Sequence, residues 1–256
     1  MFKQYYFLTS SFPELSLKDA PTISFEDLKH RFQLNLAKGD YEKLKRLRMF
    51  IDIQNLRLMW LLHPIDTRGN LTIKELESAL LAHDFFPEYV FDFLRRHEEV
   101  NYRLVHFPYL ISKFFQEEAL ENHSFLTHYF KMERELRLIF TALRAKQMKR
   151  DIVYELQYED PKDDLVAYIL AQKDMDNFEA PQEYAEIVQL FHRYQADPLR
   201  LHKHLIEYKI KRLDEMTSLI PFSIDSVLAY TAKLMLIEDW HALDQEEGDK
   251  ALESLA

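Results

Sequence analysis

Residues 40–64 read DYEKLKRLRMFIDIQNLRLMWLLHP, and this stretch decides the fold class. Its apolar residues recur every three or four positions, a spacing that places them on one face of an α-helix. They are Tyr41, Leu44, Leu47, Phe50, Ile51, Leu58 and Leu61. Asp40 is expected to cap this helix, and Pro64 is expected to end it near His63, because helical backbone is disfavoured before proline. One long amphipathic helix is therefore predicted.

The same helical periodicity continues along the chain, with capping residues and prolines between the segments. Ser24 is expected to cap a helix that runs to Lys38 and ends at Gly39, and Thr72 with Glu75 forms a capping box for a helix to His83. Pro87 lies early in the next helix, and Pro108 is expected to open another. The further helices are expected at residues 109–122, 124–158, 163–173, 181–195, 199–217 and 223–243, with Gly248 beyond the last. Residues 5–8 fit either a short strand or a buried helix turn.

The sequence therefore predicts an all-α fold of about ten helices. Three glycines in 256 residues leave no P-loop and no G-x-G-x-x-G loop, and they disfavour a hairpin-rich β fold. We expect one helical domain over 1–256, with three possible lobes at 1–85, 86–160 and 161–256.

Composition narrows the class of protein further. The chain has no cysteine and a net charge of −10, which excludes a disulfide scaffold and a Cys-ligated zinc site. Residues 1–150 carry a small positive charge, whereas residues 151–256 are strongly acidic. An acidic chain without an RNA-binding signature predicts no nucleic-acid partner. No secretory signal and no apolar run of spanning length are recognisable, so a cytoplasmic location is expected.

Residues capable of catalysis are sparse. His202 and His204 are two positions apart and would diverge on a helix, so they cannot share a metal. The doublet His83–Asp84 resembles that of helical HD phosphohydrolases, and His63 and Asp92 are the remaining ligands that could be nominated. A chance doublet is the simpler interpretation. The sequence predicts no catalytic residue, no cofactor-binding residue, no metal ligand and no cofactor, and hence a protein that is not an enzyme.

Three segments resemble one another. They are residues 50–60 (FIDIQNLRLMW), residues 130–140 (FKMERELRLIF) followed by Leu143–Arg144–Ala145–Lys146, and residues 232–240 (AKLMLIEDW). Asn55–Leu56–Arg57 and the Glu135–Leu136–Arg137 to Lys146 string resemble helices of the V-type ATPase C subunit, also called the d subunit. The opening 5–15 (YYFLTSSFPEL) and the ending from Phe222 to Trp240 resemble a bacterial family encoded with V-type ATPase genes. The chain is shorter than a typical C subunit and has Glu238–Asp239–Trp240 where Glu-Arg-Trp is expected.

This resemblance implies a mechanical role. The C subunit is built of three helical lobes that form a funnel, sits on the membrane rotor ring and receives the tip of the central shaft. By resemblance, the expected partners are the shaft and ring subunits of a V-type ATPase or ATP synthase. The expected location is peripheral, at the inner face of the membrane. A helical adaptor or assembly factor of this or another complex is the alternative, and an HD-type metal-dependent hydrolase is a remote one.

Basic residues near the start of the helix predicted over 40–63 are the expected contact surface for the membrane ring. If the slightly basic N-terminal half faces the ring, Lys43, Lys45, Arg46 and Arg48 are expected to contribute to assembly.

Overall fold

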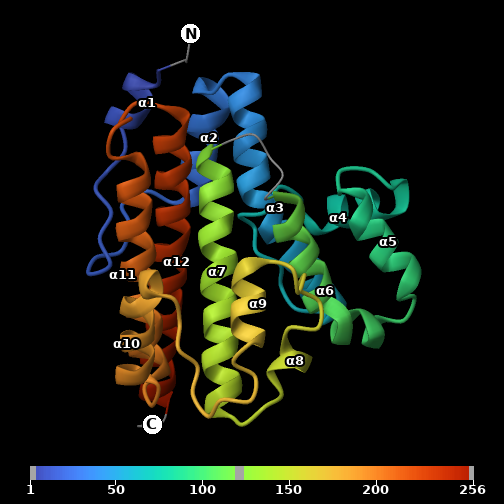
Figure 1. Ribbon diagram of the computed structural model, residues 1–256. Coiled ribbons are helices and arrows are strands. Elements are labelled where there is room, and N and C mark those ends of the chain that lie inside the picture. Colours follow the sequence, from blue (N-terminus) through green and yellow to red (C-terminus); the bar gives the residue numbers. More distant parts are fainter. Residues whose placement is uncertain (1–3, 119–123, 254–256) are drawn as a thin grey trace. The chain divides into compact units, whose positions relative to one another are not determined.

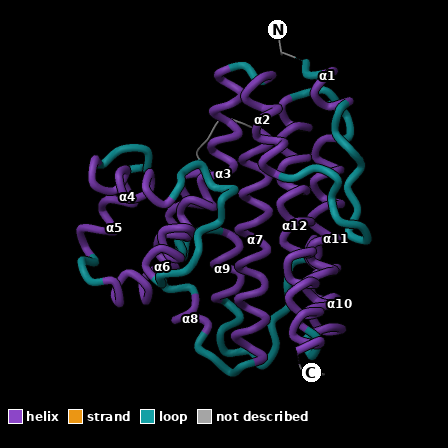
Figure 2. Tube along the Cα trace, turned by 180° about the vertical axis from the view of Figure 1, so that it is seen from behind, coloured by secondary structure: helices purple, strands orange, loops and turns teal. Residues whose placement is uncertain are grey.

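The computed structural model describes residues 4–118 and 124–253, and the side chains of 4–118 and 125–243. These residues form twelve α-helices and one 3-10 turn without a strand, so the predicted all-α fold is confirmed (Figures 1 and 2). The chain divides into two compact units, which we call the terminal unit (Met1–Leu47 and Gln189–Ala256) and the central unit (Arg48–Val188). The three lobes expected from the sequence stay a prediction. Within the described residues, every helix is too short or too polar to cross a bilayer.

The terminal unit is built on two long helices joined by a short turn. It contains α1 (Tyr6–Ser10), α2 (Phe25–Asn35), α11 (Pro198–Thr217) and α12 (Ile224–Glu253). Helices α11 and α12 lie side by side in both views, and α2 packs on α12 (Figures 1 and 2). The main-chain N–H of Phe25, at the start of α2, donates to Glu238 Oε1 of α12 over 2.8 Å. The division between the units falls inside α3 (Lys38–Trp60) and α10 (Ala185–Tyr194).

The central unit places α7 against several shorter helices. It contains α4 (Ile73–Ala82), α5 (Glu88–Arg96), α6 (Val100–Glu118), α7 (Ser124–Gln147), α8 (Ile152–Glu155), α9 (Asp164–Leu170) and the 3-10 turn Gln182–Tyr184. Helix α7 contacts α6, α8 and α9, and α5 contacts α6. Phenylalanines join three helices: the ring of Phe114 lies 5.1 Å from that of Phe50 on α3 and 5.0 Å from that of Phe130 on α7.

Most predicted helix starts are found where side chains can cap them. Ser24 and Thr72 both form capping boxes, with Asp27 and Glu75 as the third helical residues. Asp163 and Asp197 also accept main-chain hydrogen bonds at the starts of α9 and α11. These positions were predictable because the cap and its acceptor are only a few residues apart.

Both helix-ending glycines were predicted wrongly. Helix α2 ends at Asn35, with Leu36 in an extended conformation, and Gly39 lies inside α3 together with Asp40. Asp40 does not cap α3, because its carboxylate accepts a 2.5 Å hydrogen bond from the hydroxyl of Tyr5. Gly248 lies within α12, not beyond its end. A glycine ends a helix only where left-handed backbone is needed, and none of the glycines in the described residues has a positive φ.

Two further helix boundaries were predicted wrongly. Helix α6 begins at Val100 and includes Pro108, which was expected to open it. Pro108 is solvent-exposed while its neighbours Phe107 and Leu110 are buried, so the ring lies on the outer face of the helix, where proline removes one main-chain hydrogen bond without ending the helix. The expected helix over 124–158 ends at Gln147, because Lys149 adopts left-handed backbone with a φ of 52° before α8 begins.

A buried polar cluster organises the central part of α3. Arg48, Asp52 and Asn55 are 2%, 0% and 0% exposed, and their spacing places them on one face of the helix. Asn55 Nδ2 donates to the carbonyl of Asp66 over 2.9 Å, and its Oδ1 accepts from the Asp66 N–H over 2.8 Å. Asp52 accepts from Asn70 Nδ2 at 2.6 Å and from the Leu71 N–H at 3.1 Å.

Arg48, four residues before Asp52 on α3, binds the same loop. Its Nε donates to the carbonyl of Arg68 over 2.7 Å, and its Nη2 donates to the carbonyl of Gly69. Together the three side chains bind five main-chain groups within residues 66–71, the loop that leads into α4. We call Arg48, Asp52 and Asn55 the α3 clamp. The α3 clamp was not predicted from the sequence. The buried face of α3 also differs from the predicted apolar stripe: Ile53 and Leu56, outside that stripe, are fully buried, whereas Leu58 and Leu61 are half-buried.

Gly69 gives a direct test of the clamp. A Cβ at this position would lie 2.7 Å from Asp52 Oδ1 and 2.8 Å from Asn55 Nδ2, both held by their hydrogen bonds. We expect Gly69→Ala to lower the free energy of unfolding by roughly 1–3 kcal/mol, the usual cost of overpacking. Gly39→Ala is the matched control, because its Cβ would meet nothing within 4 Å. It should leave stability unchanged or raise it by up to about 1 kcal/mol. Urea unfolding that gives both variants the same effect contradicts this role of the clamp.

Asp52 gives a pH-dependent test. Burial raises the pKa of Asp52 to about 6, although the hydrogen bonds from Asn70 and Leu71 and the charge of Arg48 act to lower it. The unfolded chain should titrate near pH 4, so the folded state holds this proton more tightly. The associated stability is fully present below about pH 4 and is lost as the pH rises through 6.

Asp52→Asn removes this titration. Between pH 4 and pH 7, the free energy of unfolding of wild type should fall relative to the variant by roughly 2–3 kcal/mol. Urea unfolding of both proteins at several pH values in this range measures the difference. A constant difference would show that Asp52 does not titrate as described.

Candidate functional site

The His83–Asp84 doublet does not form a metal centre with its nominated companions. Among the side chains that the structure describes, no three His, Asp or Glu residues converge into a group that could hold a metal ion. His83 is the C-cap of α4, and its ring stacks on Phe91 with the centroids 4.8 Å apart. Asp92 pairs with Arg95 on the same helix, and His63 follows the end of α3.

The residues of the internal repeat have packing roles within the central unit. Asn55 belongs to the α3 clamp. The guanidinium of Arg57 lies 5.9 Å from the centroid of Phe107, and that of Arg137 lies 5.5 Å from the centroid of Phe115, both rings on α6. The two arginines of the repeated Leu-Arg pairs therefore cover the same helix in the same manner.

The second repeat also anchors the chain after α9. Lys146 Nζ donates to the carbonyls of Gln172 at 2.8 Å and Lys173 at 2.7 Å. Arg137 and Arg134 both pair with Glu159, which is 7% exposed, and Arg134 also binds Asp163 at 2.9 Å. These charged groups hold loops against α7, so the second repeat has a structural role within the central unit.

The basic residues expected to face a partner divide into two kinds. Lys43 and Lys45 are half-buried and pair with Asp40 and Glu42, each at 2.9 Å. Arg46 is also half-buried. Arg48 is buried in the α3 clamp, so the expectation that it forms part of a charged contact surface is wrong.

The two stretches that open and close the chain meet in the terminal unit. The N–H of Tyr5 donates to the carbonyl of Phe222 over 2.7 Å, and the rings of Tyr6 and Phe222 are 4.5 Å apart. Further along, the ring of Phe12 stacks on Tyr230 at 4.2 Å. Residues more than 200 positions apart thus form one continuous contact.

Tyr230 is the central side chain of this contact. It is 8% exposed, and burial raises its pKa to about 12, with the charge of Arg31 opposing the shift. The phenol therefore stays protonated at neutral pH and donates to the carbonyl of Pro13 over 2.9 Å. Arg31 adds a second tie by donating to the carbonyl of Ser11 over 2.9 Å. Residues 11–13 are held on α12 and α2 in this way.

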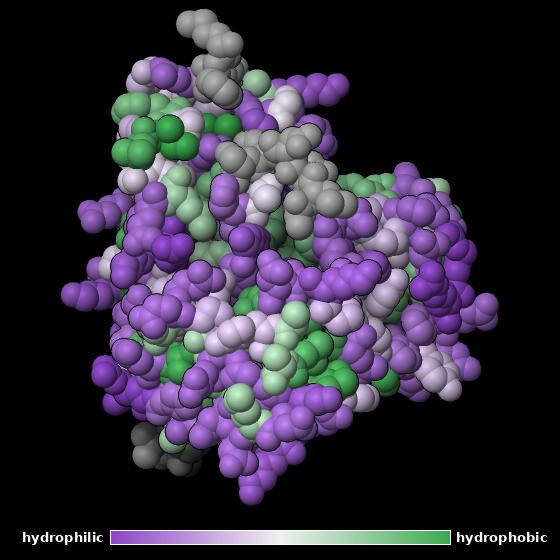
Figure 3. Space-filling view, viewed as in Figure 1, coloured by the Kyte–Doolittle hydropathy of each residue, from purple (hydrophilic) through white to green (hydrophobic). Residues whose placement is uncertain are grey.

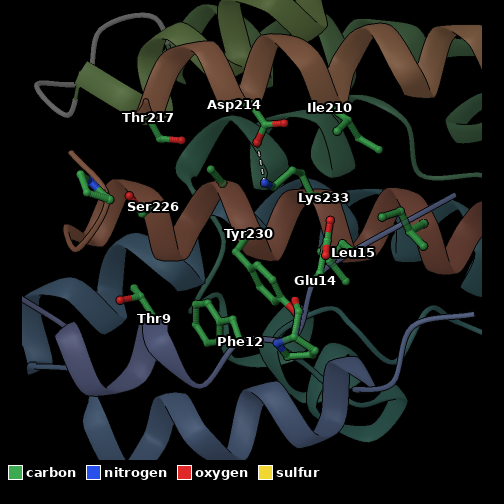
Figure 4. A pocket seen from close by; sticks show the side chains of 14 residues that line it. Thr9, Phe12, Glu14, Leu15, Ile210, Asp214, Thr217, Ser226, Tyr230 and Lys233 are labelled. Carbon is green, nitrogen blue, oxygen red and sulfur yellow. Dashed lines mark hydrogen bonds and ion pairs between the residues drawn. The ribbon is translucent and has the colours of Figure 1, made fainter. Parts of the chain in front are cut away.

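A pocket of about 420 Å³ lies beside Tyr230, between residues 9–15, α11 and α12 (Figure 4). Lys233 of α12 and Asp214 of α11 form an ion pair of 2.6 Å across it. Because that pair is neutral overall, the carboxylate of Glu14 leaves the lining acidic. An acidic lining disfavours phosphate and other anions.

The hydroxyls of the pocket are engaged with main chain. Thr9, Thr217 and Ser226 donate to the carbonyls of Tyr5, Leu213 and Ile220, respectively. In the described lining, each hydroxyl thus donates to a carbonyl oxygen, which cannot act as the base that activates a nucleophile.

The pocket beside Tyr230 was not predicted from the sequence. The opening and closing stretches stood out only by their resemblance to a family, because no local spacing signals a contact between residues 13 and 230. The aromatic density of both stretches was the available signal, since aromatic side chains are enriched in cores and in binding surfaces.

The comparisons with known proteins concern nearly the whole chain. Residues 2–256 match the family described as "Protein of unknown function (DUF2764)". A protein of Chlamydia trachomatis is 30% identical over 241 residues, which cover 91% of each chain. Proteins of Chlamydia muridarum and Chlamydia pneumoniae are 29% and 30% identical over 243 and 238 residues, covering 92% and 91% of this chain and 91% and 90% of their own. No solved structure matches the chain.

Tyr230→Phe tests the attachment of the N-terminal segment. The variant keeps the ring on Phe12 but removes the hydrogen bond to Pro13, so stability should fall by about 1 kcal/mol. Limited proteolysis should then cut residues 9–15 faster than in wild type. Tyr6→Phe is the control, since its ring keeps the contact with Phe222, and it should behave as wild type. Equal cleavage rates in Tyr230→Phe and wild type would contradict the attachment.

Proposed function

The chain belongs to the DUF2764 family, and we propose that it acts as a non-catalytic central-stalk subunit of a V-type ATPase or ATP synthase. In this role it is an adaptor, similar to the C (or d) subunit, between the rotor shaft and the membrane ring. The proposal includes a peripheral position at the cytoplasmic face of the membrane, reached through partner subunits. It needs no cofactor and no nucleic acid.

One observation supports this proposal above the others. The two stretches that carry the resemblance, residues 5–15 and 222–240, pack on each other through Tyr5, Phe12 and Tyr230. The resemblance therefore concerns two stretches that lie together in the terminal unit, which agrees with the proposal.

The lengths of the main helices agree with such a role. Helices α3, α7, α11 and α12 have 23, 24, 20 and 30 residues. An adaptor that passes torque must deform little, and continuous helices packed at crystal-like density provide that stiffness. The charged side chains inside the central unit tie loops to helices, as Arg48 and Lys146 do.

Co-purification tests the proposal. An affinity tag on this chain in its native cell should recover the V-type shaft and ring subunits in fixed proportion with it. Tagging a head subunit should recover this chain in turn.

Two other outcomes are informative. An intact, active V-type complex that lacks the chain would rule out a rotor subunit. Recovery of the chain only with incomplete complexes would identify an assembly factor in its place.

A further inference from the structure

Two histidine side chains stack on each other at the corner between α5 and α6. His97 follows the last residue of α5, and His106 lies on α6. Their ring centroids are 4.5 Å apart, and the ring planes differ by 19°. His106 Nδ1 lies 2.7 Å from the hydroxyl oxygen of Tyr158, in the chain that follows α8. We call His97 and His106 the histidine stack, and it joins three segments of the central unit.

The corner covers hydrophobic side chains. Phe93 of α5 is fully buried, and its ring centroid lies 4.8 Å from that of His97 and 6.2 Å from that of Trp60. Helix α5 packs on α6 and also buries Val90 and Phe91, whereas the surface around α5 in Figure 3 is mostly hydrophilic. Loosening of the corner would therefore expose the hydrophobic face of α5 to water.

The charged groups that face His97 are positive. Arg96 at the end of α5 and Arg103 of α6 both act on it electrostatically, and so does His106 when it is protonated. Arg103 Nε also donates to the main-chain carbonyl of His97 over 2.7 Å. From the chain after α8 the facing group is Tyr158, a phenol whose pKa is raised by burial and which stays neutral.

The stack lacks a carboxylate that would favour its protonated form. Glu98 and Glu99 follow His97 in the chain, but both are exposed. Within residues 4–118 and 125–243, no carboxylate is among the groups that act on His97, and the hydrogen-bond partner of His106 is a phenol. Protonation of the stack is therefore opposed by its surroundings.

The pKa of His97 agrees with this geometry. Burial lowers it below that of an ordinary histidine, and the positive charges of His106, Arg96 and Arg103 act in the same direction. The opened corner thus takes up a proton more readily than the closed one. The associated stability is fully present above the ordinary histidine pKa of about 6.5 and is lost as the pH falls below it.

We propose that the histidine stack is an acid-sensitive switch, which holds the α5–α6 corner closed while the rings are neutral and releases it when both are protonated. Two unit charges at the separation of these rings repel each other enough to favour the open form about fivefold, even at the dielectric constant of water. The contact between His106 and Tyr158 survives protonation, because a phenol can donate or accept. The release therefore occurs on the side of His97 and α5. This inference is independent of the proposed function.

Hydrogen exchange at single segments measures the switch. After correction for the intrinsic effect of pH on exchange, the amides of residues 93–106 should open about fivefold more often at about pH 5 than at about pH 7.5, at low salt. The loop 66–71 should not open in acid, because the proton on Asp52 stabilises the closed form there. Equal opening of residues 93–106 at both pH values would overturn the proposal.

His97→Phe tests whether the charge on His97 causes the opening. The variant keeps a flat ring against His106 and Phe93 but cannot be protonated, so the acid response of residues 93–106 should disappear. His97→Gln is a second neutral variant, with the same expected result, in case the larger ring disturbs folding. Acid opening of the wild-type size in both variants would overturn the switch.

His204→Phe is the matched control. The ring of His204 also stacks on an aromatic ring, that of Tyr194 at 4.5 Å, but its Nδ1 lies 2.8 Å from a carboxylate oxygen of Glu207. This variant should therefore keep the acid opening of residues 93–106. Loss of that opening in His204→Phe would contradict the assignment of the switch to the histidine stack.

An NMR titration of the wild-type protein needs no stable variant. The ring signals of His97 should titrate with a midpoint below the ordinary histidine value of about 6.5. A midpoint at or above that value would show that the closed corner accepts the proton without cost, and it would overturn the proposal.

Discussion

The need to satisfy buried polar groups on α3 constrains how the central unit folds around residues 66–71. Arg48, Asp52 and Asn55 are removed from water, and a buried polar group without a partner costs about 1–3 kcal/mol or more. Each is satisfied by the main chain or side chains of residues 66–71. The loop is thereby fixed in register with the helix, and α4 begins at the capping box that follows it. Gly69 is required there because a Cβ would collide with two members of the clamp.

The sequence predicted correctly those features that depend on residues close together in the chain. Caps such as Ser24 and Thr72 depend on residues three positions apart, so they could be found by reading along the chain. Gly39 and Pro108 were misread because their usual roles depend on backbone conformation and exposure, which tertiary packing decides. The α3 clamp was invisible for the same reason: its polar residues interrupt an apolar pattern, and their partners lie in a loop.

The candidate site shows the same limit more strongly. The aromatic density of the opening and closing stretches does not tell which of their residues are buried and which are exposed. The structure separates them: Tyr230 is buried and ties down the N-terminal segment, whereas Phe7 and Leu219 are exposed. The buried and the exposed residues are close in the chain. Tyr5 and Tyr6, which precede the exposed Phe7, contact Phe222 in the turn between α11 and α12. The buried polar groups thus serve the scaffold, whereas Phe7 and Leu219 are hydrophobic side chains left exposed.

Taken together, these features describe a helical protein whose buried charges hold loops against helices and whose opening and closing stretches pack on each other. Hydrogen–deuterium exchange of the full chain, with and without purified V-type shaft and ring subunits, tests this account most directly. The account predicts slower exchange at residues 5–10 and 217–224 in the presence of those subunits, with the loop 66–71 unchanged. No change at residues 5–10 and 217–224, or protection confined to other segments, would contradict it.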